Sequence, residues 1–117
     1  MSTRDDIAAA LNAAGNGVEG KQGRPDTLSP LVGWPQWVRD VPLTACGVER
    51  TWWVLIPLPA GAPAVTELMA ETIREPVLDQ LLPIGSVSAI EPINLTAQPE
   101  SSPQSVPALR FTLITTE

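Results

Sequence analysis

Apolar residues recur at helical spacing near the start of the chain. Ser2 is a good N-cap residue, and Asp5 stands three positions later, where a capping-box variant places its carboxylate. Apolar side chains then return every three or four residues until Gly15, which favours a helix end. The pattern predicts a short amphipathic helix over about residues 3–14.

A second and broader apolar face extends over residues 63–82. Pro63 suits the first turn of a helix, so the segment predicts the main helix of the protein. Pro76 lies inside it, and a proline in a helix interior removes a hydrogen bond and clashes with the preceding turn. We therefore expect a kink near Ile73, or two helices that meet there.

Two segments before the main helix have the composition of strands. Residues 33–43 contain prolines, which predicts an edge strand because proline cannot complete a hydrogen-bond ladder. Residues 51–56 are mostly apolar and rich in β-branched and aromatic side chains, which predicts a central strand covered on both faces. A hairpin turn at residues 45–47 would join the two strands.

Two segments after the main helix alternate between apolar and polar positions, as strands do. The first covers residues 86–95, and the second covers residues 106–116. In the first strand, the alternation places Val87, Ala89, Ile93 and Leu95 on one face. In the second strand, it places Leu109, Phe111 and Leu113 on one face.

The predicted element order is α-β-β-α-β-β. It predicts a single α+β domain over residues 1–117, with a mainly antiparallel sheet of about four strands, an N-terminal helix and a longer central helix. Both helices are expected on one face of the sheet. The connections at about residues 15–30 and 98–105 are polar and rich in turn-forming residues, so we expect flexible loops there.

The amino-acid composition limits the possible functions of the protein more than it limits the possible folds. The 117 residues include no histidine, no tyrosine, one cysteine and one lysine. Histidine is the commonest general base and metal ligand, and cysteine and lysine supply most of the other nucleophiles. Cys46 has only Arg50 as a nearby cation in the sequence, so it lacks the setting that activates a thiol. We expect a protein that is not an enzyme and holds no metal or cofactor.

Charge and apolar runs bear on partners and location. A net charge of −6 disfavours a nucleic-acid binder that neutralises phosphates. No apolar run approaches the roughly 20 residues of a membrane span, and the acidic start of the chain is unlike a signal peptide. We expect a soluble protein made in a cytoplasm.

Five short motifs, taken in order, resemble a known family. They are Trp34-Pro35-Gln36-Trp37, Ile56-Pro57-Leu58-Pro59, Leu82-Pro83-Ile84-Gly85, Val87-Ser88-Ala89-Ile90-Glu91-Pro92 and Val106-Pro107-Ala108-Leu109-Arg110-Phe111-Thr112-Leu113. Together with the N-terminal helix and the loop after it, they resemble the small tail terminator and head–tail joining proteins of long-tailed, siphovirus-type bacteriophages. The resemblance spans nearly the whole chain.

The resemblance implies a structural virion protein. Such a subunit would form a hexameric ring that caps the head-proximal end of the tail tube and joins it to the neck. Its partners would be further copies of itself, the major tail tube protein and a neck or connector protein. DNA would pass through the lumen without specific binding. The ring would be assembled in the host cytoplasm and would lie at the tail–neck junction.

An acidic stripe marks the main helix. Glu67, Glu71, Glu75 and Asp79 recur every four residues, a spacing that stacks side chains along one helical face. One interpretation is a solvated face that is partly offset by Arg74. The other follows from the resemblance: six copies of the stripe would line the lumen and keep its wall from gripping phosphates.

The four tryptophans divide into two pairs. Trp52 and Trp53 occupy opposite faces of the predicted central strand, which favours packing within the domain for both. Trp34 and Trp37 flank a proline after the predicted loop. For this second pair, a contact between subunits and plain packing are both open.

Two other functions stay open. One is a head–tail connector or stopper, or another minor tail protein, which the same resemblance would fit. The other belongs to a different class, a small α+β ligand-binding or enzyme domain that holds an anion through Arg39, Arg50 or Arg110.

Overall fold

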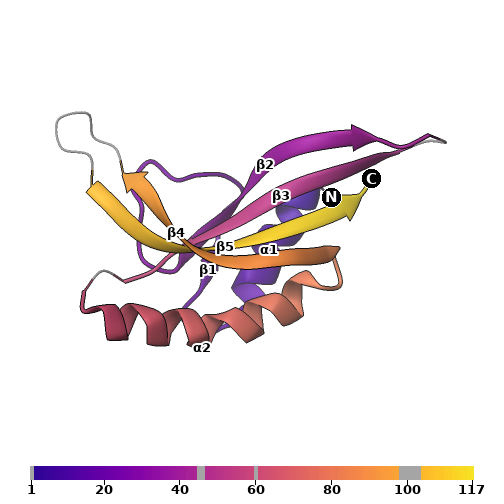
Figure 1. The fold of residues 1–117 in the computed structure, drawn as a ribbon. Coiled ribbons are helices and arrows are strands. Elements are labelled where there is room, and N and C mark those ends of the chain that lie inside the picture. Colours follow the sequence, from indigo (N-terminus) through magenta and orange to yellow (C-terminus); the bar gives the residue numbers. More distant parts are fainter. Residues whose placement is uncertain (1, 45–46, 60, 98–103) are drawn as a thin grey trace.

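A five-stranded sheet carries two helices on one face in the computed structural model (Figure 1). The structure describes residues 2–44, 47–59, 61–97 and 104–117. The elements are α1 (Thr3–Ala14), β1 (Glu19–Gly20), β2 (Val32–Pro42), β3 (Val48–Pro57), α2 (Pro63–Leu81), β4 (Ser86–Ala97) and β5 (Gln104–Thr116). The strand order is β1-β2-β3-β5-β4; β1 runs parallel to β2, and the other neighbours are antiparallel. The α+β prediction is confirmed, and the two-residue strand β1 is added to the four strands expected.

Helix α1 follows its sequence pattern closely. The Ser2 hydroxyl accepts a hydrogen bond from the Asp5 backbone, and the Asp5 carboxylate accepts one from the Ser2 backbone, which completes a capping box. Ile7 and Leu11 are fully buried against the sheet. The twelve-residue helix is too short to be stable alone, so this packing holds it.

Helix α2 is continuous from Pro63 to Leu81, so the alternative of two helices meeting inside this segment is wrong. Pro76 cannot donate to the preceding turn, at a typical cost of about 3 kcal/mol. Ile73 before the proline, and Val77 and Leu81 after it, are fully buried. Their burial offsets the missing hydrogen bond and holds the helix together through Pro76.

The core lies between the sheet and the two helices. Every second residue of β3 and of β5 faces the core, and for the last strand, β5, this confirms the predicted alternation. The buried side chains on this face of the two strands are Trp52, Val54, Ile56, Leu109, Phe111 and Leu113.

Strand β4 departs from the predicted alternation. Val87 lies opposite Leu113, but Ala89 lies opposite Thr112, because the register shifts at Ser88. Val87 therefore faces the helices, whereas Ala89 points to the other side of the sheet. The prediction that Val87 and Ala89 share a face is wrong, since a bulge breaks the two-residue period.

The segment predicted as a long first loop contains β1. The Glu19 amide donates to the Leu31 carbonyl at 2.9 Å, and the Lys21 amide donates to the Gly33 carbonyl at 2.8 Å. The Gly20 amide donates to the Asn12 side chain of α1 at 2.9 Å. This part of the segment is therefore attached both to the sheet and to α1. The second predicted loop, over about residues 98–105, falls mostly outside the described residues.

Strands β2 and β3 extend past the helices as an arm, and the molecule measures 49 × 32 × 23 Å (Figure 1). Strand β1 pairs only with Val32 and Gly33, so beyond that point β2 is a free sheet edge within the described chain. This confirms the predicted edge strand. A bulge at Val38 interrupts the pairing of β2 with β3. The predicted hairpin turn at 45–47 includes residues 45 and 46, which lie outside the described residues.

Candidate functional site

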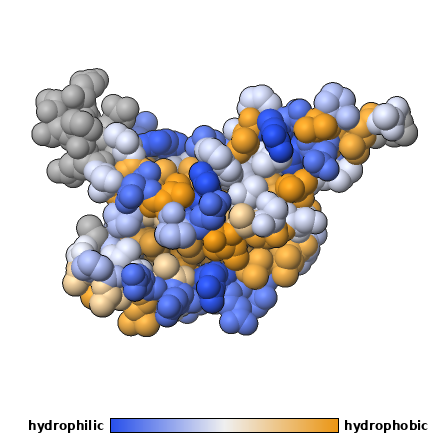
Figure 2. Space-filling model, in the orientation of Figure 1, coloured by the Kyte–Doolittle hydropathy of each residue, from blue (hydrophilic) through white to orange (hydrophobic). Residues whose placement is uncertain are grey.

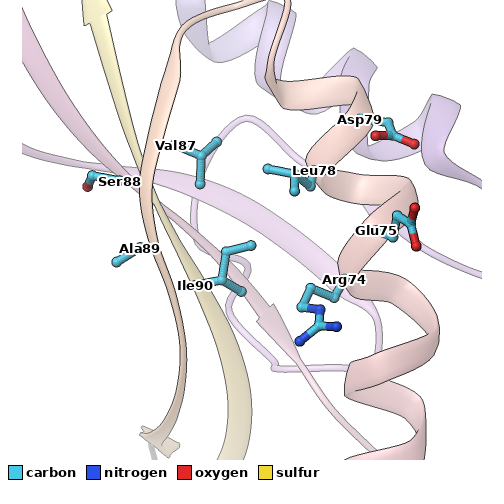
Figure 3. A pocket seen from close by; sticks show the side chains of 8 residues that line it. All are labelled: Arg74, Glu75, Leu78, Asp79, Val87, Ser88, Ala89 and Ile90. Carbon is cyan, nitrogen blue, oxygen red and sulfur yellow. The ribbon is translucent and has the colours of Figure 1, made fainter.

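The four carboxylates of the predicted stripe are all exposed on α2. Each step of four residues advances about 40° around a helix, so Glu67 and Asp79 lie about 120° apart. All four line hollows beside β4, Glu67 and Glu71 nearer the N-terminus of α2 and Glu75 and Asp79 nearer its C-terminus; the carboxylates of Glu75 and Asp79 point away from β4 (Figure 3). Among the described residues, no ion pair within 4.0 Å links Arg74 to any of them. We call these four residues the acidic ridge.

An open groove separates α2 from the edge strand β4 (Figure 3). Its largest hollow has a volume of about 600 Å³, and two smaller hollows continue along the helix towards its N-terminus. Leu78, Val87 and Ile90 point into the largest hollow, and Arg74, Glu75 and Asp79 lie along its helix side. Figure 2 shows an apolar band above the charged residues of α2. The groove offers apolar contact beside negative charge.

The tryptophans differ in exposure, and this separates Trp34 from Trp37. Trp52 lies in the core at 4% exposure, and Trp53 is half-buried on the other face of the sheet, under the Arg110 guanidinium at 4.4 Å. The prediction that these two occupy opposite faces is confirmed. Trp34 is 1% exposed, whereas Trp37 is 51% exposed. A partner can therefore make a broad contact with Trp37 but not with Trp34.

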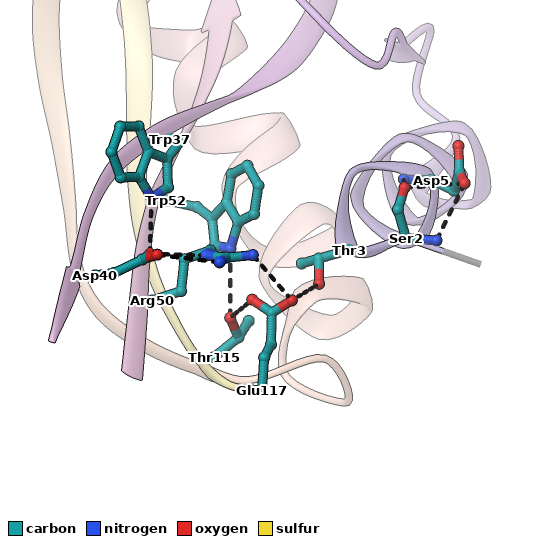
Figure 4. Close-up of polar contacts among 9 residues, drawn as sticks. All are labelled: Ser2, Thr3, Asp5, Trp37, Asp40, Arg50, Trp52, Thr115 and Glu117. Carbon is teal, nitrogen blue, oxygen red and sulfur yellow. Dashed lines mark hydrogen bonds and ion pairs between the residues drawn. The ribbon is translucent and has the colours of Figure 1, made fainter. Parts of the chain in front are cut away.

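A polar network holds Trp37 at the base of the arm (Figure 4). The Trp37 indole N–H donates to Asp40 Oδ1 at 2.7 Å, and the Arg50 guanidinium donates to both oxygens of Asp40 at 2.7 and 3.0 Å. Arg50 also reaches Glu117 Oε1 at 3.3 Å, and the Thr3 hydroxyl donates to the same oxygen at 2.8 Å. The network therefore connects the arm to the first turn of α1.

The network lowers the pKa of two carboxyl groups. The Arg50 hydrogen bonds, the largest cause, hold the pKa of Asp40 below its usual value. Burial raises the pKa of Glu117, but hydrogen bonds from Thr3 and Thr115 together with the charge of Arg50 outweigh it, so that pKa is also lowered. Both groups are therefore charged near neutral pH, and neither is tuned to exchange a proton there.

The arginines predicted for an anion site do not converge. Arg50 is paired with Asp40 and Glu117, and Arg110 forms an ion pair with Glu91 at 3.1 Å. Arg39 stands exposed on β2. Because two of the three cations already hold carboxylates, this set of residues offers little to a free anion.

Sequence reasoning missed how arginines cover the tryptophans. Arg4 lies 5.2 Å from the Trp52 ring, and Arg24 lies 5.8 Å from the Trp34 ring. Arg4 and Trp52 lie far apart in the chain, and Arg24 reaches Trp34 across an irregular loop, so no helical or strand period could have indicated either pair. Contacts of this kind contribute about 0.5–1 kcal/mol at exposed sites and more when desolvated.

In the described part of the chain, neither a cluster of metal ligands nor a membrane-spanning helix is found. No group of three or more acidic or thiol side chains there is placed to hold a metal ion. No helix in it has both the length and the apolar character needed to cross a bilayer. Cys46 lies outside the described residues.

Comparison of the sequence with models of protein families finds no matching family, and comparison with curated proteins finds no matching protein.

Proposed function

We propose that this protein is a ring-forming structural subunit of a bacteriophage tail, a tail terminator that caps the head-proximal end of the tail tube and joins it to the neck. The proposal combines the resemblance of the five sequence motifs with the shape of the domain. The expected location is the tail–neck junction of the virion. The expected partners are further copies of the chain, the tail tube protein and a neck protein.

The observation that carries the proposal is the projecting arm with its free β2 edge. Trp37 and Val41 on β2, and Leu43 directly after it, are each at least 40% exposed. Large apolar side chains exposed together on a sheet edge are typical of a surface that another chain covers. A subunit built to assemble accounts for this exposure better than a monomeric binding domain does.

The sheet order also suits a closed ring. Strands β2 and β4 stand at opposite sides of the sheet, apart from the two-residue strand β1. Contacts between two different surfaces of one chain run head to tail, and they close into a ring when the rotation per subunit permits. The free surfaces of this fold therefore match the kind of interface that a ring requires.

The acidic ridge fits the lumen of such a ring. Its carboxylates are exposed, and none forms an ion pair within 4.0 Å in the described chain. Several copies facing a central channel would repel the phosphates of passing DNA. We propose that role for the ridge, in particular for its outer part, Glu75 and Asp79.

The test is assembly with the tube-forming protein of the same genome. Electron microscopy of the two purified proteins should show tubes with a ring at one end, and tube length should shorten as the ratio of this chain rises. Trp37→Ala should reduce end binding, while Gln80→Ala, an exposed change elsewhere, should not. Binding to a neck protein without any binding to tubes would favour a connector or stopper, and binding to neither would refute both.

A further inference from the structure

We propose that the β2 edge carries a carboxylate-binding pocket, and that its occupant is the acidic ridge of a second copy of this chain. The contact would join the pocket to Glu67 and Glu71, the two ridge carboxylates that line the smaller hollows towards the N-terminus of α2. The inference rests on the proposed function, because it supplies the head-to-tail interface of the ring.

The pocket lies where β1 separates from β2. It has a volume of about 250 Å³, and its described lining is Arg4, Arg24, Trp34, Pro35, Gln36 and Trp37. Arg4 comes from α1, and Arg24 comes from the segment between β1 and β2. None of these lining residues is acidic, although the chain as a whole has a net charge of −6. The pocket is thus a local concentration of positive charge in an acidic protein.

Hydrogen-bond donors at the pocket are incompletely used. The Trp34 indole N–H is buried and finds no acceptor among the described residues. Neither Arg4 nor Arg24 forms an ion pair within 4.0 Å in the described chain. A guanidinium has five N–H groups, and the hydrogen bonds that Arg4 and Arg24 donate to backbone carbonyls use only a few of them. An anion entering the pocket would meet guanidinium N–H groups that lack partners, beside the buried indole of Trp34.

The two arginines are also held in position before any ligand arrives. Arg4 donates to the carbonyls of Gln22 at 2.9 Å and Pro35 at 3.3 Å, and it lies over the Trp52 ring. Arg24 donates to the Thr96 carbonyl at 2.8 Å and lies over the Trp34 ring. Neutral carbonyls and aromatic rings fix the side chains without cancelling their charge. Such preorganisation lowers the entropic cost of binding.

The second copy is the occupant that the structure favours. Glu67 and Glu71 lie beside β4, and β4 and β2 stand at opposite sides of the sheet. A head-to-tail contact therefore brings the β4 side of one copy to the β2 edge of the next. Trp37, at the pocket, would then face a groove lined by apolar residues that include Leu78 and Ile90. In this arrangement the arginines of one copy meet the carboxylates of the next, and exposed Trp37 meets an apolar groove. The arginine–carboxylate pairs also add directional hydrogen bonds.

Charge reversal in the full chain, followed by sedimentation velocity over a concentration series, tests the contact. Arg24→Glu and Glu71→Arg should each weaken self-association at least about tenfold, as removing close interfacial charge pairs does. The double variant should recover most of the loss. Lys21→Glu and Asp6→Arg are controls with the same charge changes at residues that line neither the pocket nor the groove, and they should change association less than about threefold. Far-UV circular dichroism and thermal unfolding must show that every variant is folded.

The outcomes separate this inference from the proposed function. If rings form and the two reversals have no effect beyond that of the controls, the pocket is not the interface, while the ring proposal stands. If the chain stays monomeric at all concentrations, acetate is the probe, and the Trp34 indole N–H signal, assigned with Trp34→Phe, is followed by NMR. A saturable shift with acetate but not with chloride would establish the pocket and overturn the second copy as its occupant. No shift would overturn the pocket as well.

Discussion

Replacing Gly20 by alanine should destabilise the protein by displacing β1 from α1. A Cβ at this position would lie 2.2 Å from the Ala8 carbonyl oxygen and 2.9 Å from the Ala8 carbonyl carbon and Cα. Ordinary contacts between such atoms are about 3.5 Å, so one element must retreat by about 1 Å. All three obstructing atoms are backbone, and no side-chain rotation can relieve the clash.

The cost follows from what holds α1 in place. Ile7 and Leu11 are fully buried, so a retreat of α1 would open the core beneath them. Overpacking of this kind typically costs about 1–3 kcal/mol, and a contact this short points to the upper end, about 3 kcal/mol. For a domain of this size, that corresponds to a melting temperature lower by roughly 10–15 °C.

Gly23→Ala is the matched control. A Cβ at Gly23 meets nothing within 4 Å, and its φ lies outside the left-handed range. The control should be neutral or stabilising by up to about 1 kcal/mol, because alanine reduces the freedom of the unfolded chain. Urea unfolding followed by tryptophan fluorescence and circular dichroism gives both values. A Gly20→Ala variant as stable as Gly23→Ala would refute the close approach of β1 to α1.

Three further predictions concern single sites. Trp34→Ala should lower the free energy of unfolding by about 3–5 kcal/mol, whereas Trp37→Ala should lower it by roughly 1 kcal/mol and mainly weaken assembly. Urea unfolding measures the stability, and sedimentation measures the assembly. An equal loss of stability in both variants would contradict the assignment of Trp34 to the core and Trp37 to the surface. The lowered pKa values of Asp40 and Glu117 predict stability that is fully present above the ordinary carboxyl pKa, about 4, and is lost as pH falls through the lowered values. Asp40→Asn should therefore flatten the fall in unfolding free energy between neutral and acid pH, and an unchanged slope would exclude its contribution. Pro76→Ala should restore a helix hydrogen bond and raise stability by about 1–3 kcal/mol, which thermal unfolding would detect; a lower melting temperature would show that the ring of the proline packs better than alanine.

Elements governed by local chemistry were predictable from the sequence. The bounds of α1 follow from a capping box and a glycine, both of which act within a few residues. The inner face of β5 follows from strict alternation at Leu109, Phe111 and Leu113. Helix α2 was located correctly, but local rules overestimated the tendency of Pro76 to break the helix. They omit the burial of Ile73 and Val77 on either side of it.

Features that depend on partners distant in the chain were not predictable. Strand β1 has only two residues and exists because Gly20 fits against α1. The bulge at Ser88 reverses the face of Ala89 without a sequence signal such as glycine. The pocket at the β2 edge joins Arg4 and Arg24 from two segments, and the sequence gives no sign that Trp34 would be buried and Trp37 exposed.

The bulge at Val38 decides which charges meet on the arm. With it, Asp40 lies opposite Arg50 and Val41 lies opposite Glu49. In a regular ladder Val38 would pair with Thr51, so that Arg39 would face Arg50 and Asp40 would face Glu49, two repulsive cross-strand pairs in place of one attraction. A homologue that lacks Val38 would lose only the unpaired residue and would keep Asp40 opposite Arg50. Natural variation should therefore preserve the match between Asp40 and Arg50 rather than the length of this stretch.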